Sequence, residues 1–279
     1  MRLKGIIILL LACIPAFALA GAKTHIRVVL DAGHGGKDHG AQGAISFEKD
    51  ITLAVTLKLG KLLEDSMKNV DVVYTRREDT YPTLIERHEI ANKANADLFI
   101  SIHVNSTPYT YTRTLQGYKT VKKKNGKTVK QPIYKSVRHH TTKRSGVETY
   151  VMGLHREGQQ KGAIGEYADN VSEEPGLLNE NDPQTQIIVS QYTKAFLGKS
   201  VTFAAKVQEQ FKAQGRADLG VKQKGLEVLA GSAMPGVLVE IGFITNVNEE
   251  TYLNSDRGQY EVAAAIYRAI NEYRRDVLK

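Results

Sequence analysis

Cysteine is almost absent from this sequence of 279 residues, because the only one is Cys13 in the N-terminal leader. A chain that loses this leader has neither a disulfide nor a thiol nucleophile, which excludes cysteine-based catalysis and is compatible with an oxidising compartment. Long apolar runs are also missing, since no stretch after the leader approaches the roughly 20 apolar residues of a membrane span. We therefore expect a soluble globular protein whose single domain carries long insertions.

The leader itself has the features of a signal peptide. Two basic residues precede the apolar run 5–17, and Ala18-Leu19-Ala20 supplies the small residues of a cleavage site. We therefore predict that residues 1–20 are removed on export and that 21–279 form the mature domain. Leu10-Leu11-Ala12-Cys13 also resembles a bacterial lipoprotein signal, so a lipid anchor on this cysteine is an alternative.

Acidic residues are missing from residues 107–147, which contain eleven Lys or Arg. Residues 157–182 show the reverse, with seven acids and one base. Asn125-Gly126 lies between two runs that contain Thr and Val, and this pattern predicts a basic hairpin insertion over 107–145. The hairpin is either a solvated surface or a site that attracts anionic envelope components. Nucleic acid is not an expected partner, because the chain is exported and has no recognition motif.

The hydrophobic pattern predicts an α/β fold with a twisted, mostly parallel central sheet and helices on both faces. Apolar runs predict strands at 26–30, 70–74, 98–102, 146–152 and 237–241. Helical spacing predicts helices at 48–67, 84–96, 184–214 and 259–277. Asp182 is expected to cap the third of these helices and Gly198 to interrupt it. The acidic stretch before Asp182 is interpreted as a loop or a short helix.

The glycine-rich stretch that follows the first strand, "VVLDAGHGGKDHG", does not fit a nucleotide site. Asp38 stands where a dinucleotide fingerprint needs glycine, and Asp31 stands where a phosphate-binding loop needs it. No Gly-x-Ser-x-Gly elbow is present. His88-Glu89 begins the helical zinc-protease motif, but Asn92 occupies the place of its second histidine.

Three polar residues lie instead at the ends of predicted elements: His34 after the first strand, Glu48 at a helix start, and His103 at the end of the third strand. In an open parallel sheet these positions converge on one crevice. Two imidazoles and a carboxylate, with one position left to water, form a catalytic zinc arrangement. Glu240 lies in an apolar strand, where a carboxylate without a partner is costly, and a role beside the metal and its water would explain its place.

Supporting roles are assigned to a few other residues. Asp31 is expected to orient a ligand imidazole through a hydrogen bond. Arg76 and Arg87 are interpreted as forming exposed ion pairs, with anchoring of loops near the cleft as the alternative. The remaining histidines are interpreted as structural or solvated.

Five runs of the sequence resemble a known family: "LDAGHGGKDHGAQG", "EKDITLAV", "TRREDTYPTLIERHEIANKANADLFISIHVNS", "GVETY" and "MPGVLVEIGFITNVNEE". Together, in this order from about residue 27 to 273, they are similar to the zinc-dependent N-acetylmuramoyl-L-alanine amidases of bacterial cell walls, the amidase 3 family. The resemblance implies that His34, Glu48 and His103 bind Zn²⁺ and that Glu240 is the catalytic glutamate. It further implies that Asn105 binds the substrate or a ligand.

The implied reaction is hydrolysis of the peptidoglycan amide between the lactyl group of N-acetylmuramic acid and L-alanine, with a zinc-bound water as nucleophile. The expected location is the periplasm, with secretion or a lipid anchor as alternatives. A catalytically inactive peptidoglycan-binding module on the same fold, or a related zinc hydrolase of another amide, is the competing interpretation. An inactive relative would usually lose a ligand or the glutamate, and all four are present.

The chain further resembles the cell-division type of this family, in which a helical insertion after the "GVETY" strand blocks the zinc with a glutamate until a partner protein displaces it. Residues 155–200 are the corresponding regulatory insertion, and "NDPQTQIIVSQYTKAFLGKSVTFAAKVQEQF" resembles the part after the blocking element. "GEYADNV" replaces the usual Arg-Glu-Asn element. Glu166 or Asp169 is therefore the expected autoinhibitory residue, and an activator protein is a possible partner.

Overall fold

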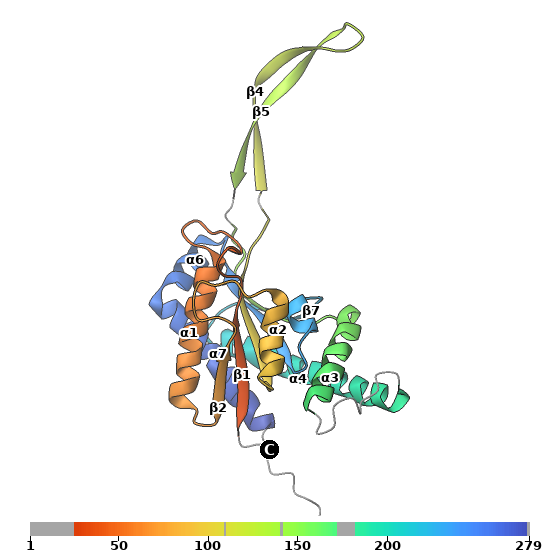
Figure 1. Cartoon of the computed structure of the whole chain (residues 1–279). Helices are drawn as coiled ribbons and strands as arrows, with labels where there is room; N and C mark the ends of the chain where they lie inside the picture. The colour runs from red at the N-terminus through yellow and green to blue at the C-terminus, as the bar shows by residue number, and fades with distance from the viewer. Residues whose placement is uncertain (1–24, 109, 140–141, 172–181, 278–279) are drawn as a thin grey trace, which may run out of the picture.

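A computed structural model describes residues 25–108, 110–139, 142–171 and 182–277. The expected signal peptide, residues 1–20, and its Cys13 lie outside these residues. The described chain forms a six-stranded sheet with helices on both faces and a long two-stranded hairpin that projects from it (Figure 1). The eight strands are β1 (Ile26–Ala32), β2 (Val70–Tyr74), β3 (Leu98–Asn105), β4 (Thr110–Lys122), β5 (Thr128–His139), β6 (Val147–Met152), β7 (Asp218–Lys224) and β8 (Gly236–Phe243).

Helices occupy most of the remaining described chain. They are α1 (Glu48–Ser66), α2 (Leu84–Lys93), α3 (Glu157–Val171), α4 (Pro183–Ala213), α5 (Glu227–Ala230), α6 (Val247–Asn254) and α7 (Asp256–Val277), with a 3₁₀ turn η1 (Leu154–Arg156) before α3. No helix within the described ranges is both long and apolar enough to cross a bilayer.

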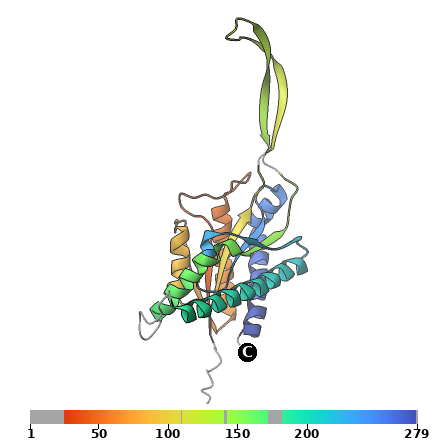
Figure 2. The ribbon, with the colours of Figure 1, turned by 90° about the vertical axis from the view of Figure 1, so that its right-hand side faces the viewer.

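The sheet has the strand order β2-β1-β3-β8-β6-β7. The first four strands are parallel, whereas β6 runs antiparallel to β8 and parallel to β7. The expected mostly parallel α/β architecture is therefore confirmed. Its carboxyl-terminal edge, where β1, β3 and β8 end, lies on the side from which the hairpin projects (Figures 1 and 2).

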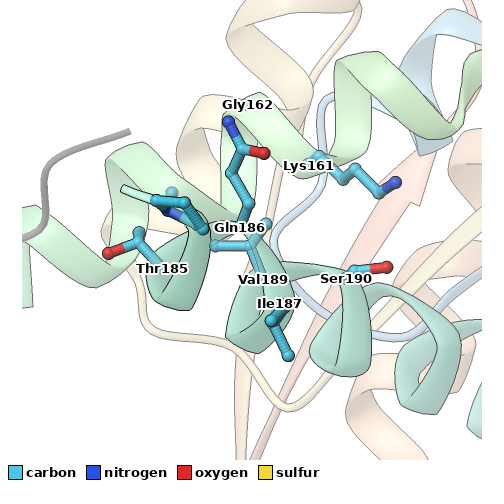
Figure 3. Close-up of a pocket in the computed structure, with 9 residues that line it drawn as sticks. Lys161, Gly162, Thr185, Gln186, Ile187, Val189 and Ser190 are labelled. Atoms are coloured by element: carbon cyan, nitrogen blue, oxygen red, sulfur yellow. The ribbon is translucent and has the colours of Figure 1, made fainter. Parts of the chain in front are cut away.

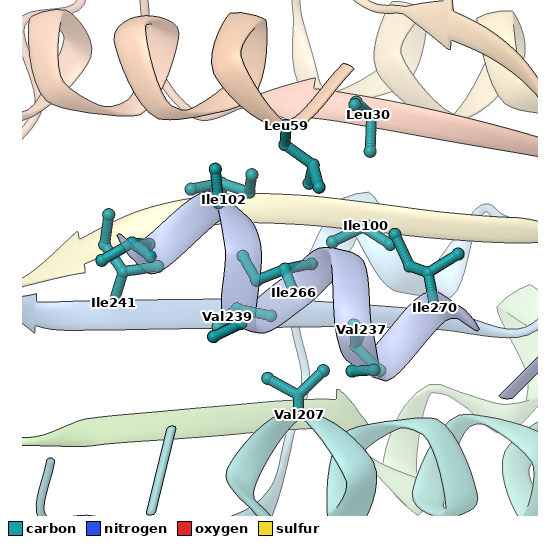
Figure 4. Packing of buried hydrophobic residues seen from close by; sticks show 14 of the residues in the cluster. Leu30, Leu59, Ile100, Ile102, Val207, Val237, Val239, Ile241, Ile266 and Ile270 are labelled. Atoms are coloured by element: carbon teal, nitrogen blue, oxygen red, sulfur yellow. The ribbon is translucent and has the colours of Figure 1, made fainter. Parts of the chain in front are cut away.

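The larger hydrophobic core lies between the sheet and α1, α4 and α7. Figure 4 shows Leu30, Ile100 and Ile102 of the sheet facing Leu59 of α1 and Ile266 of α7. All five side chains are buried. Because successive side chains of a strand alternate between faces, the intervening residues face the other side, where Val29 and Phe99 pack with α2 and α5. His103 and Glu240 also lie on this second face, at its carboxyl-terminal edge.

The structure differs from the expected elements mainly in the carboxyl-terminal half. The stretch expected as a loop or short helix contains α3, and α4 continues through Gly198 without the expected break. Asp182 does cap α4, with its carboxylate accepting the backbone N–H of Thr185 at 3.1 Å. The strand β7 and the helices α5 and α6 have no counterpart among the expected elements.

Candidate metal centre

The loop after β1 brings His34 into the site by means of close packing that only glycine permits. His34 itself has a φ of 59°, in the left-handed region. A Cβ on Gly33 would lie 2.4 Å from the His103 ring, and one on Gly40 would lie 2.6 Å from the His34 ring. These two glycines therefore let the loop fold back onto both imidazoles.

Glu48 is the first residue of α1, and its carboxylate lies between the two imidazoles. Its Oε2 is 3.1 Å from His34 Nε2 and its Oε1 is 2.9 Å from His103 Nδ1. The backbone N–H groups of Ala41 and Val104 also donate to it, at 2.8 and 2.9 Å. Burial disfavours the charged carboxylate, but these hydrogen bonds from both histidines outweigh it and hold the pKa of Glu48 well below its usual range.

The three side chains fit a tetrahedral metal ion. One ligand atom from each of His34, Glu48 and His103 lies within 4.8 Å of the others. Zn–N and Zn–O bonds of about 2.0 Å place neighbouring tetrahedral ligand atoms about 3.3 Å apart. The two imidazole nitrogens lie 3.1 and 2.9 Å from the Glu48 carboxylate, each from a different oxygen, so both nitrogens face the same carboxylate. Two imidazoles and one carboxylate also leave a fourth position open, as in catalytic zinc sites.

Asp38, and not Asp31, contacts the imidazole of a candidate ligand. Asp38 Oδ2 lies 2.8 Å from His34 Nδ1, the ring nitrogen on the side away from Glu48. Burial opposes protonation of His34, but contacts with Glu48 and Asp38 outweigh it and raise its pKa to about 9. The expectation for Asp31 was wrong because this carboxylate is buried inside the sheet and accepts hydrogen bonds from Thr75, Ser101 and Arg87.

Arg76 and Arg87 hold the loop that carries His34. Both side chains are buried, which contradicts the expected exposed ion pairs and supports the loop-anchoring alternative. Arg76 donates to the carbonyls of Ala32 and Gly33, at 2.9 Å each. Arg87 donates at 2.7 Å to Asp31 and to the carbonyl of His34. The guanidinium groups thus satisfy backbone carbonyls that the sharp turn would otherwise leave without partners.

Glu240 lies in β8 directly opposite His103 in the register of the parallel pair. The residue is partly buried, and its Oε2 is fully buried without a hydrogen-bond partner. Burial raises the pKa of Glu240 to about 7, with the nearby Glu48 charge adding to the shift and His103 opposing it. A buried carboxyl that titrates near neutrality beside a metal-ligand set is suited to general acid and base catalysis.

Glu148 is a buried carboxylate that the sequence reasoning quoted in a motif without assigning it a role. It pairs with Glu240 across the antiparallel β6–β8 ladder. Tyr150 and Lys222 donate to it at 2.6 and 2.9 Å, and the Asn105 amide donates at 3.2 Å. Burial raises the pKa of Glu148, but Tyr150, Lys222 and the charge of Arg144 outweigh it and leave the pKa below its usual value. An acid inside an otherwise apolar strand, the signal that identified Glu240, could have identified Glu148.

The two expected autoinhibitory residues are in α3. Glu166 lines a groove with His88 and Asn92 of α2 and is not part of the cluster of ligand atoms. The side chain of Asp169 lies outside the described part of the structure. Asn92, which replaces a histidine of the zinc-protease motif, instead bonds the backbone of Gly231 and Ala233 and joins α2 to the turn after α5.

A second groove, of about 610 Å³, lies between α3 and α4 (Figure 3). Lys161 and Gly162 line it from α3, and Thr185, Ile187 and Val189 line it from α4. This groove contains none of the metal ligands, so the helical segment after β6 has its own concave surface.

Comparisons with known proteins identify the family of this chain. A family model described as N-acetylmuramoyl-L-alanine amidase matches residues 28–272. The uncharacterized protein YqiI of Bacillus subtilis (strain 168) is 30% identical over 98% of this chain and 95% of its own length. N-acetylmuramoyl-L-alanine amidase AmiC of Escherichia coli O6:H1 is 31% identical over 93% of this chain. The match spans 55% of the length of AmiC.

Solved structures show the same fold. The catalytic domain of CwlV, an N-acetylmuramoyl-L-alanine amidase from Bacillus (Paenibacillus) polymyxa var. colistinus, superposes with a TM-score of 0.56 and 27% identity. That superposition covers 90% of this chain and 99% of the CwlV domain. The CwlD amidase of Clostridioides difficile, solved in complex with the GerS lipoprotein, has a TM-score of 0.58 at 24% identity, covering 89% of this chain and 98% of CwlD.

Proposed function

We propose, from the premise that this chain belongs to the N-acetylmuramoyl-L-alanine amidase family, that it hydrolyses the amide between the lactyl group of N-acetylmuramic acid and the L-alanine of the stem peptide. The observation that carries this proposal is the buried Glu240 Oε2, which has no hydrogen-bond partner, beside the ligand set of His34, Glu48 and His103. The competing interpretation, an inactive peptidoglycan-binding module, gives no reason to keep both the ligand set and this glutamate.

The metal we propose is Zn²⁺, held by His34, Glu48 and His103. The donor set and its spacing support this choice. When bound, Zn²⁺ supplies Lewis acidity that polarises the scissile carbonyl and lowers the pKa of an attacking water. Asp38 holds the far nitrogen of the His34 ring, which fixes the tautomer and the direction of the ligand nitrogen.

Glu240 would act as the general base and then as the general acid. Its carboxylate accepts the proton of the attacking water and later delivers it to the leaving alanine nitrogen. In the metal-free site burial raises the pKa of Glu240, so this carboxyl holds a proton more readily than an exposed glutamate does. The free Oε2 is available for this exchange because no protein donor occupies it.

Asn105 is proposed to bind the substrate near this centre. It ends β3 two residues after His103, and one N–H of its amide donates to Glu148. An asparagine amide has two N–H donors, so the second is available to a carbonyl of the substrate. Glu148 would therefore hold Asn105 in a fixed orientation.

Export and regulation complete the proposal. The signal peptide pattern at residues 1–20 supports export to a periplasm, and the resemblance to the cell-division type supports a role in cell separation. A regulatory segment in 155–200 that responds to an activator protein stays part of the proposal. In the described arrangement Glu166 does not approach the ligands, so blocking by this residue requires α3 to move.

The test is hydrolysis of purified muropeptides by the protein, followed by mass analysis of the products. We expect an intact stem peptide that begins with L-alanine, no product after metal chelation, and recovery on addition of Zn²⁺. Glu240→Gln should keep stoichiometric zinc by elemental analysis and lose at least about a hundredfold in kcat. Turnover that is unchanged in this variant, or products cut at another bond, would overturn the proposal.

A further inference from the structure

The hairpin of β4 and β5 stands clear of the rest of the molecule. Figures 1 and 2 show it extending away from the sheet domain in both views. Its strands pair with each other over Thr110–Lys122 and Thr128–His139, and within the described chain neither packs extensively against any other element. At about 3.3 Å per residue, strands of this length reach about 40 Å. Both faces of this ribbon are therefore exposed to solvent.

One face of the hairpin gathers its tyrosines. Cross-strand partners share a face, and the pairing places Tyr111, Leu115 and Tyr134 on the same side. A bulge between Leu115 and Gly117 shifts the alternation by one residue, so that Tyr118 joins them. The three tyrosines of this face, called here the tyrosine face, are 60%, 61% and 51% exposed for residues 111, 118 and 134.

Positive charge accompanies these aromatic rings. Arg113, Lys122 and Lys130 share the tyrosine face by the same register, whereas Lys119 and Lys135 lie on the opposite face. The whole segment 107–147 has no acidic residue to neutralise them. The tip, Lys122-Lys123-Lys124-Asn125-Gly126-Lys127, has no apolar side chain to insert into a lipid layer. The exposed aromatic rings and positive charges of the hairpin therefore suit a hydrated, anionic ligand that also has flat apolar surfaces.

The base of the hairpin joins the candidate metal centre. The chain enters β4 directly after β3, which carries His103 and Asn105. It leaves β5 into β6, which carries Glu148 beside Glu240. A long polymer that lies along the hairpin is thus led to the same edge of the sheet at which the ligands converge. Binding along such a surface places a polymer next to the site, so the expected ligand is the polymer that the site cleaves.

We propose that the tyrosine face is a second binding surface for peptidoglycan, separate from the catalytic centre. Tyrosine rings would stack on the apolar faces of the sugar rings, and Arg113, Lys122 and Lys130 would pair with the carboxylates of the stem peptides. This inference rests on the proposed function, because that function makes peptidoglycan the polymer at the site. Binding of a glycan chain to the hairpin, away from the metal centre, raises the effective concentration of that chain's other amide bonds at the metal centre.

The test measures binding of the purified protein to insoluble peptidoglycan by co-sedimentation. All proteins carry Glu240→Gln so that the wall is not digested, and the wall is first stripped of phosphodiester-linked polymers. We expect Tyr118→Ser/Tyr134→Ser to weaken binding about tenfold. Lys122→Gln/Lys130→Gln should weaken binding and reduce its dependence on salt. The matched control, Lys119→Gln/Lys135→Gln, removes the same charge from the opposite face and should bind nearly as tightly as the parent.

Several results would overturn the inference. The two lysine double variants could lose the same amount of binding, or the tyrosine double variant could bind as tightly as the parent. Binding that depends on the hairpin could also appear only with unstripped walls or with vesicles of anionic phospholipid. The same hairpin variants without Glu240→Gln should cleave a small soluble muropeptide at the parent rate, because it is too short to span both surfaces. Absence of that cleavage in the parent would refute the proposed function alone, since the binding measurement does not depend on turnover.

Discussion

At the scale of single residues, the candidate ligands are positioned by neighbouring side chains that are not themselves candidate ligands. Asp38 fixes the ring of His34, and Arg76 and Arg87 hold the loop that carries it. The sequence predicts the residues that would hold a metal because His34 and His103 stand at the ends of strands and Glu48 at the start of a helix. It does not predict their supports, because which buried carboxylate faces which imidazole depends on side-chain packing that no local pattern encodes.

The contact between Asp38 and His34 leads to a prediction about metal affinity. In Asp38→Asn the ring loses its charged partner, and the affinity for Zn²⁺ should fall about 10- to 100-fold. Competition with a chromophoric chelator measures this change. Asp50→Asn, an exposed position in the first turn of α1, is the control and should leave the affinity within about twofold. An equal loss in both variants would mean that general charge, and not the hydrogen bond, sets the affinity.

The raised pKa of Glu240 predicts a stability effect in the metal-free protein. Its folded pKa is about 7 against a reference value of 4.5, so the folded state holds this proton more tightly than the unfolded state. Stability therefore falls as pH rises from about 4.5 to 7, and above this window the charged group costs about 3 kcal/mol. Glu240→Gln should be more stable than the parent by about this amount at pH 8 and similar to it at pH 4. Chemical denaturation at both pH values measures the difference, and equal differences at the two values would contradict it.

At the scale of helices and strands, the sequence predicts an element accurately where its local sequence pattern is strong. Val70–Tyr74 forms the strand over the expected residues, and Asp182 with Pro183 begins α4 at the expected place. The misses have weak local signals. The strand β7 (Asp218–Lys224) is polar and half exposed at the sheet edge, and its pairing with β6 alone makes it a strand. The glycines of α3 disfavour a helix. Packing of this segment against α4 and α5 nevertheless stabilises the helical conformation.

The cap of α4 predicts a modest change in stability. Asp182→Ala removes the acceptor for the Thr185 N–H and should lower the free energy of unfolding by about 1 kcal/mol. Asp182→Asn keeps an oxygen acceptor and should recover most of this loss. Urea denaturation of the three proteins measures the difference. An asparagine variant as unstable as the alanine variant would show that charge at the helix terminus, and not the hydrogen bond, supplies the stabilisation.

At the scale of the whole molecule, the candidate ligands join three separate parts of the chain: the loop after β1, the start of α1 and the end of β3. A metal that binds only the folded state stabilises it by about 2.7 kcal/mol at a free concentration of 100 times Kd. Zn²⁺ should therefore raise the Tm of the parent by several degrees. His103→Ala should abolish this rise, whereas His25→Ala, at an exposed position before β1, should keep it. An equal shift in all three proteins would indicate binding elsewhere.

The sheet reverses direction once, between β8 and β6. On one side of that boundary the carboxyl ends of β1 and β3 lead to candidate site residues, and on the other side the start of β6 contributes Glu148. The residues that we propose to act in hydrolysis lie on the first side. Glu148, which accepts hydrogen bonds from Asn105 and Tyr150, lies at the border on the second side. Substitutions in residues 142–146, just ahead of β6, can thus change the support that Arg144 gives to Glu148 and leave the candidate metal ligands in place.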